Sequence, residues 1–234
     1  MTPRAATYVL VHGAWHGPWA FEPLTRILDE RGVSWIAPAL PSSHDDGDGS
    51  ADLAADAAVV VAAAVAAGPV VLVGHSYAGA VVTEAAPRLD VREIVYIAAL
   101  VPRVGESATE ASRRVRVRTQ LDDAMRLEGA WLTLDPELAA VALYGHLAPS
   151  DAAAQVARLG RQTLASFRSP RQAADVEVPR RYLRCLEDQA IDPSLQDQMA
   201  MSCDTVIDLA SDHSPFHSHP DVLADALFDE IRKG

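Results

Sequence analysis

The chain has 234 residues, of which 49% are hydrophobic and 22% charged, and these values are ordinary for one globular domain. Its 20 basic and 32 acidic residues give a formal net charge of −12, which argues against a nucleic acid or an anionic membrane surface as the partner. The two cysteines, Cys185 and Cys203, are expected to be buried and reduced, so no disulfide framework is predicted.

The sequence shows no sign of export or of membrane insertion. Residues 1–6 lack the charged and then apolar pattern of a signal peptide. The uninterrupted apolar run 57–67 is too short to span a bilayer, and we expect it to form a helix packed into the protein. The sequence therefore predicts a soluble, cytoplasmic protein with a single domain over residues 1–234.

Strand and helix patterns alternate through the first hundred residues. Aliphatic and β-branched runs predict four strands, at residues 7–11, 34–37, 70–73 and 92–99. Helical patterns fall between them, at about 20–31, 51–67 and 80–86. This alternation predicts βαβ units, which form a parallel sheet covered by helices on both faces.

Polar residues between these elements are interpreted as structural. The acidic loop 45–48 does not have the spacing of a calcium-binding loop, so we expect it to be solvated. Ser50 is expected to cap the next helix, with Asp52 in its first turn. A later helix is expected to begin with Asp135 as its N-cap and Pro136 as its first residue.

The alternation stops near residue 102. From there to about residue 179 the sequence shows helical patterns broken by Pro and Gly, and it shows no convincing strand. Regular order then resumes with two strands and a terminal helix, at 181–186, 205–209 and 221–232. We therefore predict a core in which helices cover both faces of the sheet, and an all-helical cap inserted into it. The core comprises residues 1–101 and 180–234, and the cap comprises residues 102–179.

The buried strand at 70–73 leads directly into a helical pattern through a turn of small residues. The turn contains Gly74, Ser76, Ala78 and Gly79. A strand, a sharp turn and a helix with a serine at the apex predict the nucleophile elbow of α/β-hydrolases, G-x-S-x-G. Here Ala78 occupies the fifth position and the glycine follows it, and alanine is small enough to let the helix pass. The alternative is an ordinary Gly-Ser loop between two buried elements.

Polar residues follow the predicted strands in an informative order. In an open parallel sheet, the loops after the strands meet at one edge and form the site. Ser76, Asp188 and His213 each follow a strand, in the order Ser, acid, His of α/β-hydrolases. We predict that Ser76 is the nucleophile, that His213 accepts its proton, and that Asp188 orients the imidazole.

Other titratable residues near these positions leave alternatives open. Three further carboxylates are candidates for the acid: Glu187, Asp192 and Asp212. His75 adjoins the proposed nucleophile, but neighbouring residues in a turn point apart, so we expect it in the core. His217 and His219 form an H-x-H pair without a third ligand nearby, and a surface turn is expected there rather than a metal site.

The loop after the first strand supplies the remaining expected parts of the site. Hydrolases of this fold take one oxyanion-hole amide from such a loop and one from the residue after the nucleophile. The corresponding backbone amides are those of Ala14 and Tyr77, although an ordinary tight turn is the alternative for this loop. Gly13, Trp131 and His146 are the candidate substrate-binding residues.

Five segments carry motifs that are specific when taken together. They are LVHGAWHGPW (10–19), GHSYAG (74–79), VPRVGES (101–107), YLRCLEDQAI (182–191) and DHSPF (212–216). The chain thereby resembles the plant methylesterase and hydroxynitrile lyase family and its bacterial esterase relatives. The resemblance implies an α/β-hydrolase fold, catalysis without a cofactor or metal, and a small, largely apolar pocket under the cap. It also implies that Asp188, rather than Glu187, is the acid of the triad.

The same resemblance helps to separate two reactions. Cyanohydrin-cleaving members of the family carry Thr at the position of Gly13 and Lys directly after the triad histidine, where this chain has Ser214. We therefore expect a serine hydrolase that cleaves a small carboxylic ester through an acyl-enzyme, with a small molecule as its partner. The alternatives are a lyase, a cyclase or a dehydratase on the same fold, or a ligand receptor that retains it. The oligomeric state stays open, a homodimer being one alternative.

Overall fold

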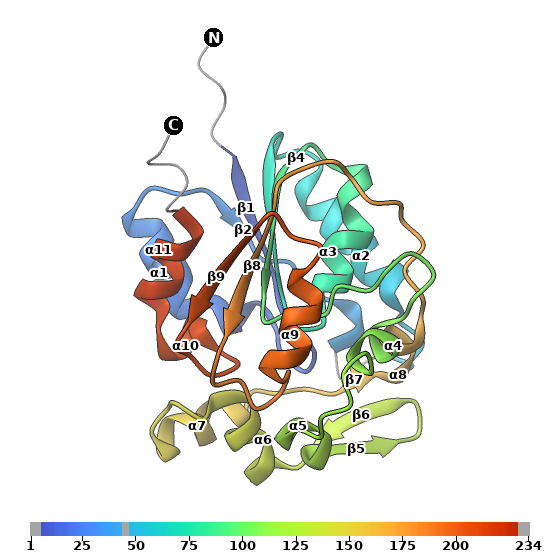
Figure 1. The fold of residues 1–234 in the computed structure, drawn as a ribbon, viewed down its shortest axis with the longest axis vertical. Coiled ribbons are helices and arrows are strands. Elements are labelled where there is room, and N and C mark those ends of the chain that lie inside the picture. The colour runs from blue at the N-terminus through green and yellow to red at the C-terminus, as the bar shows by residue number, and fades with distance from the viewer. Residues whose placement is uncertain (1–5, 44–46, 229–234) are drawn as a thin grey trace.

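A six-stranded parallel sheet forms the centre of the molecule (Figure 1). The computed structural model describes residues 6–43 and 47–228. Within them, the strand order is β2-β1-β3-β4-β8-β9, and every neighbouring pair is parallel. The strands are β1 (Thr7–Val11), β2 (Trp35–Ile36), β3 (Val70–His75), β4 (Val91–Ile97), β8 (Arg180–Cys185) and β9 (Thr205–Leu209). The predicted α/β-hydrolase fold is confirmed.

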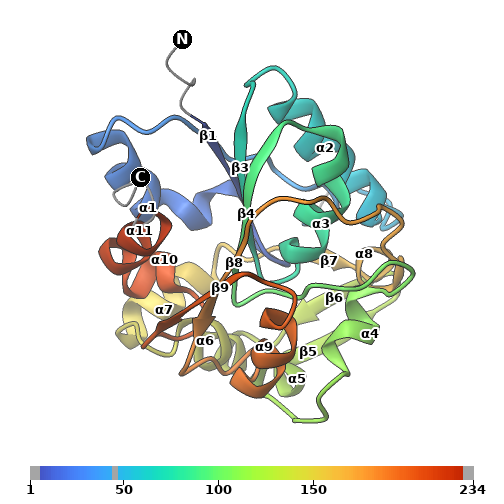
Figure 2. The same cartoon turned by 45° about the horizontal axis from the view of Figure 1, so that its top comes forward.

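Helices cover both faces of this sheet, as Figures 1 and 2 show. One face is covered by α1 (Glu22–Glu30), α10 (Pro215–Ser218) and α11 (Pro220–Phe228). The other face is covered by α2 (Leu53–Ala64), α3 (Ala78–Ala85) and α9 (Pro193–Ala200). Short 3-10 turns add η1 (Pro18–Phe21), η2 (Pro41–Ser43) and η3 (Ala86–Arg88).

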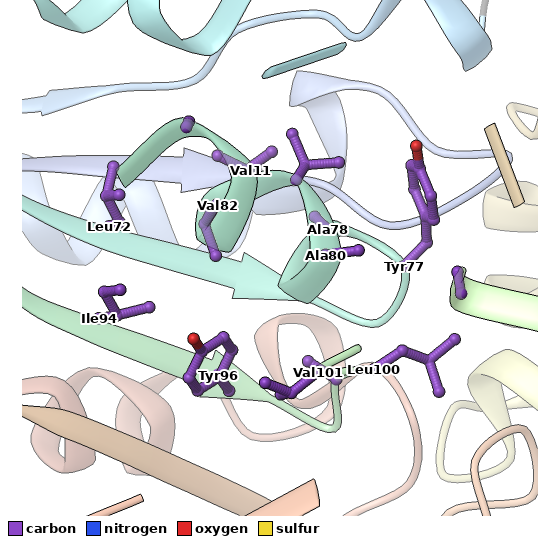
Figure 3. Close-up of a cluster of buried hydrophobic side chains, with 14 of the residues drawn as sticks. Val11, Leu72, Tyr77, Ala78, Ala80, Val82, Ile94, Tyr96, Leu100 and Val101 are labelled. Carbon is purple, nitrogen blue, oxygen red and sulfur yellow. The ribbon is translucent and has the colours of Figure 1, made fainter. Parts of the chain in front are cut away.

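The strands divide the core into two layers because successive side chains of a strand point to opposite faces. In β1, Val9 and Val11 pack toward α2 and α3, whereas Tyr8 and Leu10 pack toward α1 and α11. Figure 3 shows the first of these layers, in which Leu72 lies near Val82 of α3. Because both layers are apolar, the central strands β1 and β3 are largely apolar rather than alternating, which is why they could be predicted from their sequence.

An insertion between β4 and β8 forms a cap over one edge of the sheet (Figure 1). It contains α4 (Ala108–Ser112), α5 (Gln120–Ala124), β5 (Met125–Glu128), β6 (Trp131–Leu134), α6 (Pro136–Tyr144), α7 (Pro149–Val156), β7 (Gln162–Thr163) and α8 (Leu164–Arg168). Strands β5, β6 and β7 form an antiparallel sheet, so the prediction of an all-helical cap is wrong. The pattern was hidden because β5 is mostly exposed, and β7 has only two residues.

Three predictions of local structure can be compared with the structure, and one of them is wrong. The N-cap of α2 is Asp52, which accepts a hydrogen bond from Ala55 N at 2.9 Å, so the expected cap by Ser50 is wrong. Asp135 caps α6 as predicted. The predicted terminal helix is present as α11, and its expected residues 229–232, like residues 45 and 46 of the acidic loop, lie outside the described residues. No helix in the described part of the chain is long and apolar enough to cross a bilayer.

Candidate active site

Ser76 lies at a strained turn between β3 and α3. Its φ angle is +55°, in the left-handed region that side-chain-bearing residues rarely adopt. A β-carbon on Gly74 would lie 2.7 Å from the Ala78 carbonyl oxygen, and one on Gly79 would lie 2.4 Å from the Leu100 carbonyl oxygen. The two glycines therefore let the helix and the end of β4 approach the turn, and Ala78 leaves enough room for both.

The loops after β8 and β9 bring Asp188 and His213 together. His213 Nδ1 lies 2.8 Å from Asp188 Oδ2, and both residues are buried. Because an ionised carboxylate can only accept, Nδ1 carries the proton and Nε2 is left with its lone pair. The backbone amides of Ala190 and Ile191 donate to Asp188 Oδ1 at 2.7 and 2.9 Å, which fixes the carboxylate.

The expected core position of His75 is confirmed. Its side chain is buried, and its Nε2 donates to the His213 carbonyl oxygen at 2.9 Å. Burial lowers the pKa of the His75 imidazole well below its usual value, so this ring is neutral. His75 thus has a structural role, because its side chain holds the backbone at His213.

The three alternative acids are engaged elsewhere. Glu187 is exposed and lies 3.1 Å from His146 Nε2. Asp192 is the N-cap of α9 and accepts from Ser194 N at 2.9 Å. Asp212 accepts from His146 N at 3.0 Å and from Ser218 Oγ at 2.8 Å, in accord with the structural role expected for it.

The loop after β1 lies directly against Ser76. A β-carbon on Gly13 would be 2.9 Å from Ser76 Cβ, so the backbone can approach the serine only because this residue is glycine. Two histidines hold the carbonyls of the loop: His12 Nδ1 donates to Gly13 O at 2.9 Å, and His16 Nδ1 donates to Ala14 O at 2.7 Å. Burial lowers the pKa of the His16 imidazole to about 3, which keeps this ring neutral.

Two backbone amides belong to the segments around the serine. Tyr77 directly follows Ser76 in the chain, and Ala14 lies in the loop after β1. Neither amide donates a hydrogen bond to another protein group within the described residues. Both amides are therefore available to donate a hydrogen bond to a bound group.

A cavity of about 470 Å³ opens between this edge of the sheet and the cap. Ser76 and Tyr77 lie in its wall on the core side. Apolar side chains from core and cap form most of the remainder: Trp15, Leu100, Val115, Leu121, Met125, Leu132, Phe167, Ile191 and Leu195. The cavity is large enough for a small molecule, and its wall favours an apolar one.

The structure places the three candidate substrate-binding residues outside the lining of this cavity. Gly13 lies behind Ser76, as its close approach shows. Trp131 lies in β6, where the Arg161 guanidinium covers its ring at 4.2 Å. His146 joins the cap to the loops after β8 and β9 through its contacts with Glu187 and Asp212. Most of the lining residues come instead from the cap, whose side chains pattern alone could not place.

A buried polar cluster links Tyr77 to the cap and is absent from the sequence predictions. The Tyr77 hydroxyl donates to Asp56 Oδ2 at 2.8 Å, and Ser42 Oγ donates to the same oxygen at 2.6 Å. Gln162 of the cap donates from Nε2 to Ser42 Oγ at 2.8 Å. Burial raises the pKa of the Asp56 carboxyl to about 6. The signal in the sequence was a lone carboxylate within an apolar helix.

The H-x-H pair lies at the end of α10, with His217 inside the helix and His219 directly after it. The rings of His217 and Tyr144 contact each other, and those of His219 and His146 do the same. Over residues 6–43 and 47–228, no group of three or more His, Cys, Asp or Glu side chains is arranged to hold a metal ion.

A serine at a strand-to-helix turn, an Asp–His pair after the last strands and a cavity beneath an inserted cap define the class of α/β-hydrolases. The sequence matches the profile described as the alpha/beta hydrolase family over residues 8–226. The chain belongs to this family.

Individual proteins of known sequence or structure are also similar to this chain. It is 28% identical to the alpha/beta hydrolase nvfD of Aspergillus novofumigatus over 92% of each chain. It is 36% identical to a carbendazim hydrolyzing esterase of a Nocardioides species over 110 residues, or 44% of this chain and 45% of that protein. The solved structure of methylesterase MES16 from Arabidopsis superposes with a TM-score of 0.79 at 23% identity, over 98% of this chain and 100% of that one.

Proposed function

We propose that the chain is a serine hydrolase that cleaves small carboxylic esters through an acyl-enzyme intermediate. The observation that carries this proposal is the 2.8 Å hydrogen bond between His213 Nδ1 and Asp188 Oδ2. With its Nδ1 proton held by a carboxylate, the imidazole has Nε2 available to accept a proton from a hydroxyl. The proposed source of that hydroxyl is Ser76, whose turn borders the cavity.

In the proposed mechanism, Ser76 Oγ attacks the ester carbonyl carbon while its proton passes to His213 Nε2. The negative charge then develops on the former carbonyl oxygen, and the amides of Ala14 and Tyr77 stabilise it. The bond to the alcohol oxygen breaks, and the alcohol leaves with the proton from His213. Water attacks the acyl-enzyme by the same route, which releases the carboxylic acid and restores the serine.

The comparisons support hydrolysis as the type of reaction. The family to which the chain belongs is named for hydrolases, and the Nocardioides relative is named as an esterase. Ester cleavage also agrees with the largely apolar wall of the cavity, because esters of small acids carry little polarity away from the carbonyl group.

The test is the Ser76→Ala variant with para-nitrophenyl butyrate as substrate. We expect turnover to fall to the uncatalysed rate with an unchanged circular dichroism spectrum, because the proposed acyl-enzyme forms on the Ser76 hydroxyl. A fluorophosphonate probe should label the wild-type protein and not the variant. Ser202→Ala, at an exposed serine remote from the cavity lining, is the matched control and should retain full labelling. Labelling of Ser76→Ala at another serine would overturn the proposal.

Cyanohydrin cleavage is a separate outcome of the same assay. Gly13 offers no side chain to bind a cyanohydrin hydroxyl, and Ser214 places no positive charge next to His213. We therefore expect negligible release of cyanide from mandelonitrile. Release of cyanide faster than hydrolysis of every ester tested would replace the proposed reaction by that of a lyase.

A further inference from the structure

The cavity wall carries three arginines together with its apolar residues. Arg113 and Arg116 follow α4, and Arg168 ends α8, which packs beside α4 in the cap (Figures 1 and 2). All three are exposed residues, whereas Ser76 and Tyr77 in the same wall are buried. The arginines therefore mark the solvent side of the cavity, and the serine marks its inner side.

None of these three guanidinium groups has a hydrogen-bond or ion-pair partner among the described residues. Their immediate neighbours differ. Arg114 is paired with Glu106, and Arg118 donates from Nε to Asp123 Oδ1 at 2.7 Å. Within the segment 113–118, the arginines that line the cavity are therefore the unpaired ones, and those that do not line it are paired.

Two carboxylates also line the cavity, but each already caps a helix. Asp122 accepts from Thr119 N at 2.9 Å in the capping box of α5. Asp192 accepts from Ser194 N at 2.9 Å as the N-cap of α9. Neither acid is paired with an arginine of the wall, and three arginines against two carboxylates leave the lining with a net positive charge.

The positive charge of this cavity wall contrasts with the negative charge of the whole chain. The formal net charge is −12, so the average field of the molecule repels an anion. Three unpaired arginines at one opening reverse that sign locally, and a cleft with low-dielectric walls focuses such a field on whatever approaches. A guanidinium group also matches a carboxylate in geometry, since it can donate two parallel hydrogen bonds to it.

We propose that the ester hydrolysed at Ser76 carries a carboxylate, which Arg113, Arg116 and Arg168 bind at the solvent side of the cavity. This inference rests on the proposed function and adds the chemical class of the substrate. The ester group lies at the serine, an apolar spacer contacts the wall at residues such as Val115 and Phe167, and the charge stays at the opening. The substrate is thus an amphiphilic half-ester or an ester of a carboxylated alcohol.

The experiment compares charged and neutral esters of matched shape. One arm uses mono-para-nitrophenyl adipate against para-nitrophenyl hexanoate, which places the carboxylate on the acyl side. The other arm uses para-acetoxybenzoate against para-acetoxybenzamide, which places it on the alcohol side. We expect kcat/KM to favour the charged member of at least one pair by about tenfold, since exposed arginine contacts contribute modestly and add up. The preference should fall as salt is added.

Substitution identifies the groups responsible. Arg113→Gln, Arg116→Gln and Arg168→Gln should each lower the charged-to-neutral ratio of kcat/KM by about two- to fivefold, mainly through KM, and the triple variant should abolish the preference. Arg118→Gln removes one charge from the same segment outside the cavity lining and is the matched control, expected to keep the ratio.

The outcomes separate this inference from the proposed function. If all esters depend on Ser76 but neither charged ester is preferred, or if Arg118→Gln changes the ratio as much as the other variants, the carboxylate site is wrong and the hydrolase stands. If ester cleavage survives Ser76→Ala, the proposed function itself fails. A preference that the triple variant retains would also overturn the assignment to these arginines.

Discussion

Both carboxylate oxygens of Asp188 are occupied. Oδ1 accepts from the amides of Ala190 and Ile191, and Oδ2 accepts from His213 and from Gln196 Nε2 at 3.0 Å. Rotation of the carboxylate would break several of these bonds at once, so the imidazole is held in one orientation. A backbone loop and a helix residue thus position the acid independently of the histidine.

Asp188→Asn tests this arrangement. The amide can present its NH2 group to His213 Nδ1, which would favour the tautomer with the proton on Nε2 and leave no base for the serine. We expect kcat for para-nitrophenyl butyrate to fall by about three to four orders of magnitude, as for the corresponding change in serine proteases. Asp208→Asn, at an exposed carboxylate paired with Arg184, is the control and should retain wild-type kcat. Near-normal turnover in Asp188→Asn, with a collapse in Asp212→Asn, would transfer the role to Asp212.

The positions of these residues could be predicted because the end of a strand is visible in sequence. Ser76, Asp188 and His213 each follow a predicted strand, and parallel strands bring such ends to one edge. Gln196 could not be predicted, since its contact with Asp188 depends on how α9 packs against β8. Asp192 adjoins the same loop in sequence, but its side chain caps that helix.

Helix α3 lies so close to the residues after β4 that one of its positions has no room for a side chain. A β-carbon on Gly79 would lie 2.4 Å from the Leu100 carbonyl oxygen and 2.8 Å from Ala99 Cβ. Both atoms belong to a segment that is tied to the serine turn, because Leu100 N donates to Ser76 O at 3.0 Å. The glycine is therefore required by a neighbouring backbone rather than by its own dihedral angles.

Gly79→Ala sets two effects of opposite sign against each other. Alanine favours a helix over glycine by about 1 kcal/mol, whereas overpacking against a fixed backbone costs about 1–3 kcal/mol. Because the contact is with main-chain atoms, we expect the second effect to win and the free energy of unfolding in urea to fall by about 1–2 kcal/mol. Gly47→Ala, where the nearest atom to a β-carbon is 3.6 Å away, is the control and should be nearly neutral. A stabilised Gly79→Ala would show that the helix can move away.

The strands of the central sheet were predicted from their apolar and β-branched residues, whereas the strands of the cap were not. In contrast, β5 carries Arg126 and Glu128 on an exposed hairpin whose turn contains Gly129 at φ +63°, so nothing in its pattern required a sheet. Its pairing partner β6 (WLTL) was also missed, because four residues were too short a run to be recognised without the other strand of the hairpin.

The stability of the whole molecule depends on a carboxyl group buried beneath the cap. Asp56 accepts from the Ser42 amide at 3.1 Å in addition to its two hydroxyl donors, yet burial dominates and raises its pKa from 3.8 to about 6. The folded state therefore favours the protonated form. This contribution to stability is fully present below about pH 3.8 and is lost as the pH rises through about 6.

Asp56→Asn removes that pH dependence, because the amide does not ionise. We expect the free energy of unfolding of the variant, measured relative to wild type in urea, to improve by roughly 2–3 kcal/mol between pH 4 and pH 7. Asp52→Asn in the same helix is the control, since asparagine also caps a helix, and the gain should be confined to Asp56→Asn. A constant difference between variant and wild type across this range would mean that Asp56 titrates as an exposed carboxyl does.

Residues 98–179 are the single crossover between β4 and β8, which are neighbours in the sheet. The pairing of these strands, with Ile94 opposite Arg180, is set by the strands themselves, and closing a longer or shorter loop changes the free energy only slowly with length. The length of the crossover can therefore change at little cost in closure entropy, provided that residues 98–100 are kept, because Leu100 N donates to Ser76 O and Ala98 N donates to Leu183 O. Gln162 is one of the cap residues that an altered crossover must retain, since it reaches Ser42 and, through it, Asp56 and Tyr77. His146 is another, through Glu187 and Asp212.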